Sequence, residues 1–387
     1  MAGARRCRSA GGHPLLGARH ESPRGETLFA GEIAVSDPAW LDDHRVFGRV
    51  LVPGALFGAM AASAVRPEGG GSIVVEDLQL RSPLVLPDTE QEDDPVQPVR
   101  DLQLLLEDAG GTSQRNFEVF SRGAGEEGWT LHAEGRVGID AAPPERARID
   151  VEAFTAGLSP EDVSAFYRSK ADEGVHLGPR FRTSRALWSG DGEAAGEVVL
   201  PESADRRAAE VHPVLLDGCL QVMATARKRS GLEEDGAYLV FGCDRFWLAE
   251  APERVFCHAR LRPPSEAATS GDGPLEVISG DLRIYTLEGT EIGGLSGYVS
   301  AATRSSGRRG PLSSRRPRVW ETSCTRSSGG IVRRRRRCRP QTSCPAPKPW
   351  QPSRIRSRRT WWPRASTRPA GQRCSAIWSG WPGRLRS

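Results

Sequence analysis

The sequence lacks three features that would place it in familiar classes of protein. No two of its eight cysteines have the C-x-x-C spacing of metal and redox sites. No apolar run long enough for a signal peptide follows the basic N-terminus. The longest uncharged run, Val50–Val65, is shorter than the roughly 20 residues that a membrane-spanning helix needs. These absences argue against a disulfide framework, secretion and membrane insertion, and predict a cytoplasmic protein with reduced thiols.

Acidic residues are almost missing from the last part of the chain. Residues 304–387 hold 22 arginines and Lys348 but only one acidic residue, Glu321, which gives a net charge of +22. Residues 1–303 carry a net charge of −18. Such an acidic body is poorly suited to binding nucleic acid or an anionic membrane, so that only the tail has the charge for such a role.

The basic tail also has few aliphatic residues. Leu, Ile, Val and Phe make up seven of its 84 residues, well below the roughly 20% associated with folding at high net charge. We therefore predict that residues 303–387 form an Arg-rich tail of low order. Six tryptophans among Arg, Ser, Pro and Gly are what a GC-rich gene yields in a shifted reading frame. The alternatives are a nucleic-acid-binding arm around Arg333–Arg337 and an inert linker.

Strand patterns dominate the rest of the chain. Alternating apolar residues predict two series of strands, separated by an Ala- and Pro-rich linker at 140–150. The first series comprises Thr27–Ser36, Ile73–Leu80, Val99–Leu106, Asn116–Ser121 and Trp129–Ile139, and the second Thr183–Trp188, Glu193–Leu200, Tyr238–Leu248, Arg254–Leu261, Leu275–Leu287 and Thr290–Ser300. Each series holds one helix that is apolar on every side, Gly54–Val65 and Pro213–Ala226. Another helix is predicted to begin with Ser159 as its cap and Pro160 in its first turn.

One buried helix within each antiparallel series predicts an α+β fold in which a curved sheet wraps a central helix. This arrangement is called a hotdog, although other α+β sheets share the same strand pattern. The predicted domains are one hotdog at 13–140, a second at 151–302 and the tail at 303–387.

A histidine precedes the first buried helix. His44 is followed by Gly48 and then by Pro53 and Gly54, which open the helix. Free N–H groups at a helix N-terminus suit a carbonyl oxygen that gains negative charge. A neutral imidazole beside an apolar tunnel can remove a proton from the carbon next to that carbonyl. The alternative is that His44 only satisfies a turn.

An aspartate lies within the second buried helix. Ionised Asp217 is costly in this apolar setting unless the carboxyl is paired or protonated. Burial raises the pKa of a carboxyl, so that Asp217 can donate a proton near neutral pH. Gln221 follows four residues later on the same helical face and can orient the carboxyl. The alternative is that Asp217 interacts with the dipole at the helix N-terminus.

These motifs resemble those of the dehydratase domains of modular type I polyketide synthases, which are relatives of the fatty-acid synthase dehydratase. The resemblance covers residues 13 to about 302. It is carried by His13–Gly17 (HPLLG), the H-x3-G-x4-P-G pattern from His44 to Gly54, the GPRF segment Gly178–Phe181, and Asp217 with Gln221. It implies a double hotdog, two antiparallel curved sheets each wrapping a central helix, in which His44 and Asp217 lie on opposite walls of one tunnel.

The resemblance also implies a reaction. A (3R)-3-hydroxyacyl thioester, held on the phosphopantetheine arm of an acyl carrier protein, would lose water to give a 2-enoyl thioester in polyketide biosynthesis, a step shared with fatty acid metabolism. His44 would take the α-proton and Asp217 would protonate the departing hydroxyl. Gln221 would hold Asp217, and the amide of Gly54 would receive the thioester oxygen, with Gly48 and Pro53 as supporting residues. The domain itself would bind no cofactor or metal.

The implied partners are an acyl carrier protein, the neighbouring synthase domains and, from the family's tendency to pair, a second copy in a homodimer. No membrane partner is expected, and nucleic acid only through the tail. The acyl carrier is generally acidic, so a local basic patch has to overcome the acidic body. Arg180, Arg182 and Arg185 form the nearest cluster. The alternative is that they are solvated charges on a strand.

One departure from the family lies directly before the GPRF segment. Many relatives have a tyrosine at this position, where the present chain has Leu177 preceded by His176. Any role of that hydroxyl therefore cannot be carried over. We expect Leu177, Pro179 and Phe181 to lie along the substrate tunnel.

Two other readings fit the same residues. The same fold and side chains can shift a double bond, as an isomerase, or add a hydroxyl of the chain to the alkene to close an oxygen ring, as a cyclase. A non-catalytic remnant with a nucleic-acid-binding tail requires salt-sensitive binding by residues 304–387 and no turnover.

Overall fold

The computed structural model describes residues 13–65, 71–87, 99–108, 113–140, 146–204, 211–227, 236–250, 252–263, 269–270, 273–274 and 277–303. The tail predicted at 303–387 lies outside the described residues except for Thr303. Within the described part of the chain, no helix combines the length and the apolar character needed to cross a bilayer.

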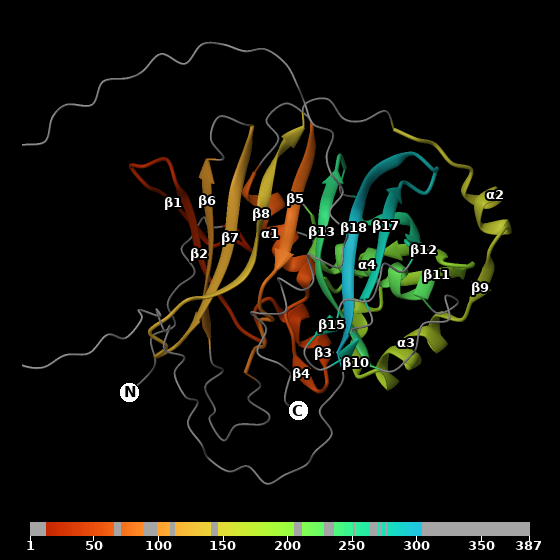
Figure 1. Cartoon of the computed structure of the whole chain (residues 1–387), viewed down its shortest axis with the longest axis horizontal. Coiled ribbons are helices and arrows are strands. Elements are labelled where there is room, and N and C mark those ends of the chain that lie inside the picture. The colour runs from red at the N-terminus through yellow and green to blue at the C-terminus, as the bar shows by residue number, and fades with distance from the viewer. Residues whose placement is uncertain are drawn as a thin grey trace, which may run out of the picture. The chain divides into compact units, whose positions relative to one another are not determined.

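A thirteen-stranded antiparallel sheet runs through the described residues (Figure 1). Its first half follows the order β1 (Ala18–Glu21), β2 (Thr27–Ile33), β6 (Arg100–Asp108), β7 (Gln114–Gly123), β8 (Thr130–Asp140) and β5 (Ser72–Leu80). The second half continues with β13 (Ala237–Leu248), β18 (Glu291–Thr303), β17 (Val277–Tyr285), β14 (Arg254–Leu261), β12 (Glu193–Val199), β11 (Ser184–Ser189) and β9 (Ser159–Glu161). The two strand series predicted from the sequence are therefore the two halves of this sheet.

The two halves join where β5 pairs with β13. Gly242 of β13 lies in this pairing, next to a bulge where the pairing of β13 with β18 shifts register, and its φ is +153°. A Cβ atom at this position would overlap the carbonyl oxygen of Leu78 on β5. Glycine is therefore needed at the seam, because the backbones of the two halves approach more closely than any side chain permits.

Each half of the sheet packs on its own helix. The helix α1 (Gly54–Ala64) lies on β5 and β8, and α4 (Pro213–Arg227) lies on β11, β12, β14 and β17. Nearly every residue of both helices is buried, as the apolar sequence on all sides predicts. The two helices also contact each other. The double hotdog expected from the sequence is the observed fold, with its two sheets merged at the seam.

The predicted helix start at Ser159 is wrong. Ser159–Glu161 forms the edge strand β9, which pairs with β11, and the helix α3 (Val163–Asp172) begins after it. Asp162 caps α3 by accepting hydrogen bonds from the N–H groups of Ser164 and Ala165. The short helix α2 (Val151–Ala156), capped by Asp150, was not predicted.

A second, three-stranded sheet brings the two halves together near the site. Its order is β10 (Val175–Leu177), β3 (His44–Val46) and β4 (Arg49–Val50). Leu177 of the second half pairs with His44 of the first. Two short 3₁₀ helices flank this sheet, Ala39–Asp43 and Pro179–Phe181, and a separate ribbon pairs β15 (Thr269–Ser270) with β16 (Gly273–Pro274).

Candidate active site

The His44 imidazole is buried at the start of β3 with a fixed tautomer. Its Nδ1 lies 2.7 Å from the carbonyl oxygen of Leu51. Because a carbonyl oxygen only accepts hydrogen bonds, Nδ1 carries the proton and the Nε2 of the neutral ring keeps its lone pair. The ring of Phe181 packs on the imidazole at 5.0 Å between centroids. Nε2 of His44 is thereby left as a base.

The GPRF segment holds this arrangement together. Gly178 donates its N–H to the carbonyl of Asp43 over 2.7 Å, and a Cβ at Gly178 would lie 2.5 Å from the Asp43 carboxyl carbon. Only glycine lets the chain pass so close. The N–H of Arg180 then donates to Asp43 Oδ2 over 2.8 Å. The turn places Phe181, which has no exposed surface, between His44 and α4.

Asp217 lies on α4, one turn before Gln221. Burial raises the pKa of Asp217, while the positive charge of protonated His44 and a hydrogen bond from Gln221 oppose the rise. Nε2 of Gln221 donates to Asp217 Oδ2 and to the carbonyl of Phe181, both over 3.0 Å. Because Oδ2 accepts this bond, Oδ1 is the oxygen that can carry a transferable proton. The effect of burial makes Asp217 an acid that keeps its proton to higher pH than an exposed aspartate.

A buried tyrosine that the sequence analysis did not single out fixes the Gln221 amide. The N–H of Ser184 donates to the Tyr167 hydroxyl over 3.0 Å, and this hydroxyl donates to Oε1 of Gln221 over 3.1 Å. Burial raises the pKa of Tyr167, so the hydroxyl stays protonated and acts as a donor. Tyr167 lies on α3, fifty residues before Asp217, and no spacing rule links the two positions.

His44 and Asp217 line one cavity of about 150 Å³. Of the predicted supporting residues, Pro53, Gly54 and Gln221 also line it, and so does Leu177, which was predicted to lie along the substrate tunnel. Most of the remaining wall is apolar, from Val46, Leu51, Val52, Phe57, Leu80, Leu84, Phe166, Leu220, Met223, Leu239, Val240 and Ile278. The structure therefore brings the predicted base and acid, from different halves of the chain, to the same apolar space.

The other predicted residues lie beside the cavity and are not among those that line it. Gly48 occupies the β3–β4 turn with φ +78°, which a side chain disfavours. Pro179 and Phe181 belong to the 3₁₀ turn. Arg180 pairs with Asp43 at 3.5 Å, and Arg182 donates to the carbonyl of Leu177 over 2.9 Å. Both arginines therefore have partners within the fold.

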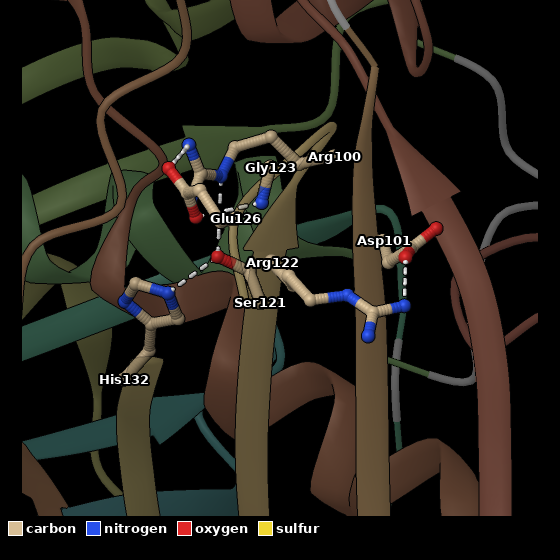
Figure 2. Close-up of polar contacts among 7 residues, drawn as sticks. All are labelled: Arg100, Asp101, Ser121, Arg122, Gly123, Glu126 and His132. Atoms are coloured by element: carbon tan, nitrogen blue, oxygen red, sulfur yellow. Dashed lines mark hydrogen bonds and ion pairs between the residues drawn. The ribbon is translucent and has the colours of Figure 1, made fainter. Parts of the chain in front are cut away.

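His132, a histidine outside the two motifs, has a structural role. His132 on β8 is buried, and its Nδ1 donates to the carbonyl of Ser82, which lines the cavity. Its Nε2 accepts from the Ser121 hydroxyl at 2.7 Å, and Arg100 donates to the same hydroxyl (Figure 2). Burial lowers the pKa of His132 to about 4. Its ring stacks on Phe57 at 5.9 Å, so the network supports the cavity wall from behind.

His176 is exposed on β10 and is not among the residues that line the cavity. Cys219 is a buried core residue. Among the described residues, no three His, Cys, Asp or Glu side chains are grouped as metal ligands would be.

Comparison with known proteins agrees with this geometry. Residues 13–122 match the model described as "Polyketide synthase dehydratase domain", and residues 147–308 match "Polyketide synthase dehydratase N-terminal domain". Polyketide synthase GfsE of Streptomyces halstedii is 34% identical over 271 residues, which are 68% of this chain and 7% of GfsE. Mycoketide-CoA synthase of Mycobacterium tuberculosis is 32% identical over 68% of this chain and 6% of its own length. The chain thus spans less than a tenth of either relative.

Solved structures of similar domains share the fold. The dehydratase domain from the CurF module of curacin polyketide synthase is 26% identical, with a TM-score of 0.64, and the alignment covers 75% of this chain and 99% of that domain. An isomerase-inactive variant of GphF DH1 is 27% identical with a TM-score of 0.62, over 76% of this chain and 99% of that one. The two matched segments cover most of both hotdog halves and include His44 and Asp217. The chain therefore belongs to the family of type I polyketide synthase dehydratase domains.

Proposed function

We propose that this domain removes water from a (3R)-3-hydroxyacyl thioester to give a 2-enoyl thioester. The proposal rests on one observation, that a side chain able to accept a proton and a side chain able to donate one line the same cavity. His44 has a free lone pair on Nε2, and Asp217 has a raised pKa and an oxygen able to hold a proton. A base and an acid poised in this way match the two proton transfers of dehydration.

In the proposed reaction, Nε2 of His44 takes a proton from the α-carbon of the thioester. The electron pair of that C–H bond forms the α–β double bond as the bond between the β-carbon and its hydroxyl oxygen breaks. The proton on Oδ1 of Asp217 joins the departing hydroxyl, which leaves as water. His44 ends protonated and Asp217 ionised, and exchange with solvent restores both. Each transfer contributes about 10²- to 10⁴-fold to the rate.

The thioester oxygen gains negative charge while the α-proton leaves. Gly54 begins α1 at the cavity wall, where the first N–H groups of the helix have no acceptor within the helix. We assign its amide to receive this oxygen, with the positive end of the helix dipole behind it. A Cβ at Gly54 would lie 2.5 Å from the Leu80 side chain, so glycine also keeps this approach open.

The substrate is proposed to arrive on the phosphopantetheine arm of an acyl carrier protein, so the domain itself needs no bound cofactor. Neighbouring synthase domains, and a second copy of this chain in a homodimer, are the further proposed partners. Arg180 and Arg182 remain predicted contacts for the carrier, together with Arg185. Arg182 and Arg185 are exposed and Arg180 is half-buried, while Arg180 also pairs with Asp43 and Arg182 with the Leu177 carbonyl.

The test is mass spectrometry of a 3-hydroxyacyl carrier incubated with the full chain. We expect loss of one water and an absorbance of the conjugated 2-enoyl thioester. His44→Ala and Asp217→Asn should each slow this loss by at least about 10²-fold. His176→Ala is the matched control, because this histidine is exposed and does not line the cavity. Turnover that survives both active-site changes contradicts the proposal, and a 3-enoyl or cyclic ether product would identify an isomerase or cyclase.

A further inference from the structure

Two hydroxyl groups of β18 line the cavity and have no part in the proton transfers. They belong to Tyr298 and Ser300, which are 6 and 2% exposed. β18 lies between β13 and β17 in the sheet (Figure 1). Ser300 pairs with Val240 on one side and with Ile278 on the other, and both of these neighbours also line the cavity. The two hydroxyls therefore lie beside apolar side chains on the cavity face of the sheet.

A β-bulge turns Tyr298 toward the cavity. Leu295 and Tyr298 are three residues apart on β18, but their partners on β17 are only two residues apart. β18 therefore holds one extra residue here, and Gly297 within the bulge has a φ of +66°. Side chains alternate between the two faces of a regular strand, so without the bulge Leu295 and Tyr298 would face opposite sides. In the observed fold both are buried in the same core cluster.

The pair of hydroxyls retains a hydrogen-bond donor for a third group. Burial raises the pKa of Tyr298 to about 12, while a hydrogen bond with the Ser300 hydroxyl opposes the rise. The phenol therefore keeps its proton at neutral pH, and each residue contributes one O–H donor. Within the described part of the chain, no third partner of either hydroxyl is found. One donor is used between the two residues, whichever of them gives it, and the other O–H is left for a guest.

The Tyr298 hydroxyl lies within electrostatic reach of the acid. The charge of ionised Asp217 adds to the rise in the pKa of Tyr298, and the charge of Arg227 opposes it. These two residues are about 15 Å apart along the axis of α4. An acyl chain that extends from Asp217 through the cavity toward Arg227 would therefore pass this hydroxyl. Chains assembled from two-carbon units carry oxygens on alternate carbons, so the first oxygens beyond the β-hydroxyl are those on carbons 5 and 7.

A purely structural explanation is also available for the two residues. In that explanation the ring of Tyr298 only fills the core beside the bulge, and Ser300 only satisfies the phenol. Such a role is indifferent to an oxygen on the guest. A donor that faces an apolar guest loses the hydrogen bonds that it makes to water, so a donor subsite favours a guest that carries an acceptor.

We infer that Tyr298 and Ser300 form a subsite that donates a hydrogen bond to a neutral acceptor oxygen on the acyl chain of the bound thioester. This inference rests on the proposed function, which supplies the thioester. The acceptor is a keto or hydroxyl oxygen beyond the β-carbon. The domain would thus favour chains that keep such an oxygen over chains that are fully reduced beyond the β-carbon.

The test measures binding of three probes that have no β-hydroxyl and cannot lose water, so it does not depend on turnover. Calorimetry of the full chain gives the Kd of octanoyl, 5-oxooctanoyl and 7-oxooctanoyl pantetheine. We expect at least one oxo probe to bind about fivefold more tightly than the octanoyl probe, a difference of about 1 kcal/mol. Oxo probes that bind no more tightly than the octanoyl probe overturn the inference, even if the chain dehydrates its substrate. A preference without any turnover would contradict the proposed function and leave the subsite in place.

Variants then assign the preference to the two hydroxyls, because charged donors also line the cavity. Tyr298→Phe should lower the ratio of octanoyl to oxo Kd about threefold, and Tyr298→Phe combined with Ser300→Ala should abolish the preference. Tyr285→Phe is the matched control, since this buried tyrosine of β17 does not line the cavity. A preference that persists in the double variant overturns the inference. If the variants fail to fold, the three-probe comparison in the unchanged chain still tests it.

Discussion

The hydrogen bond from Gln221 to Asp217 should set the upper pH limit of activity. Burial raises the pKa of Asp217, and this bond partly offsets the rise. Gln221→Leu removes the bond, so the pKa of Asp217 should rise further. A hydrogen bond to a charged group contributes about 1.5–3 kcal/mol, and about 1.36 kcal/mol corresponds to one pKa unit. Because the same Nε2 also bonds the Phe181 carbonyl, we expect the lower end of this range, about one unit.

The assay is the pH profile of kcat for a 3-hydroxyacyl carrier. The alkaline limb reports loss of the proton from the general acid, so in Gln221→Leu it should move about one pH unit higher while the plateau falls. The plateau falls because the carboxyl is no longer held toward the substrate. Tyr285→Phe is the control, a buried tyrosine on β17 that does not line the cavity. A lower plateau with the limb at its original pH would refute the reasoning, since Gln221 would then act only through packing.

Four further predictions follow from the same structure. Tyr167→Phe frees the Gln221 amide to turn, so the alkaline limb should move in the same direction by less than one unit, with Tyr285→Phe again as the control. Asp217→Asn should raise the Tm at pH 8 and lose this advantage toward pH 4. The pKa of Asp217 is higher in the folded protein than in the unfolded chain, so ionising this carboxyl destabilises the fold at pH values above the pKa of the unfolded chain. The pKa of His132 is lowered to about 4, so the free energy of unfolding should fall by about 1.4 kcal/mol per unit from pH 6.5 toward 4, and urea titrations of His132→Gln should lose this slope. Gly242→Ala should cost about 3 kcal/mol by overlap at the seam, whereas Gly125→Ala, also at positive φ but with open space around it, should cost about 1 kcal/mol in the same titrations.

The elements that local sequence determines were predicted well. The helices α1 and α4 carry apolar residues on every side, and this pattern can be read from the local sequence without knowledge of the tertiary contacts. Ser159 illustrates the limit of local signals. Its Ser-Pro-Glu pattern is typical of a helix start, but pairing with β11 holds the segment as a strand, and the neighbouring Asp162 supplies the cap. A tertiary contact therefore overrode a local preference of about 1 kcal/mol.

The residues of the site could be predicted only where they belong to a sequence motif of fixed spacing. His44 and Asp217 stand in patterns that mark them, and both line the cavity. The contact of Tyr167 with Gln221 depends on how α3 docks on α4, as does the ion pair of Glu173 with Arg227, and no pattern within either helix encodes this docking.

The acid–base centre should act independently of the charge of Arg227, and the distance along α4 explains why. His44 and Asp217 have neutral hydrogen-bond partners, the Leu51 carbonyl and the Gln221 amide. Arg227, in the last turn of α4, lies about 15 Å along the helix axis from Asp217. At that separation, one unit charge contributes about 0.3–1 kcal/mol for an effective dielectric constant between about 80 and 20. This is less than one pKa unit, so Arg227→Gln should leave the alkaline limb of the kcat profile within one unit of its original pH.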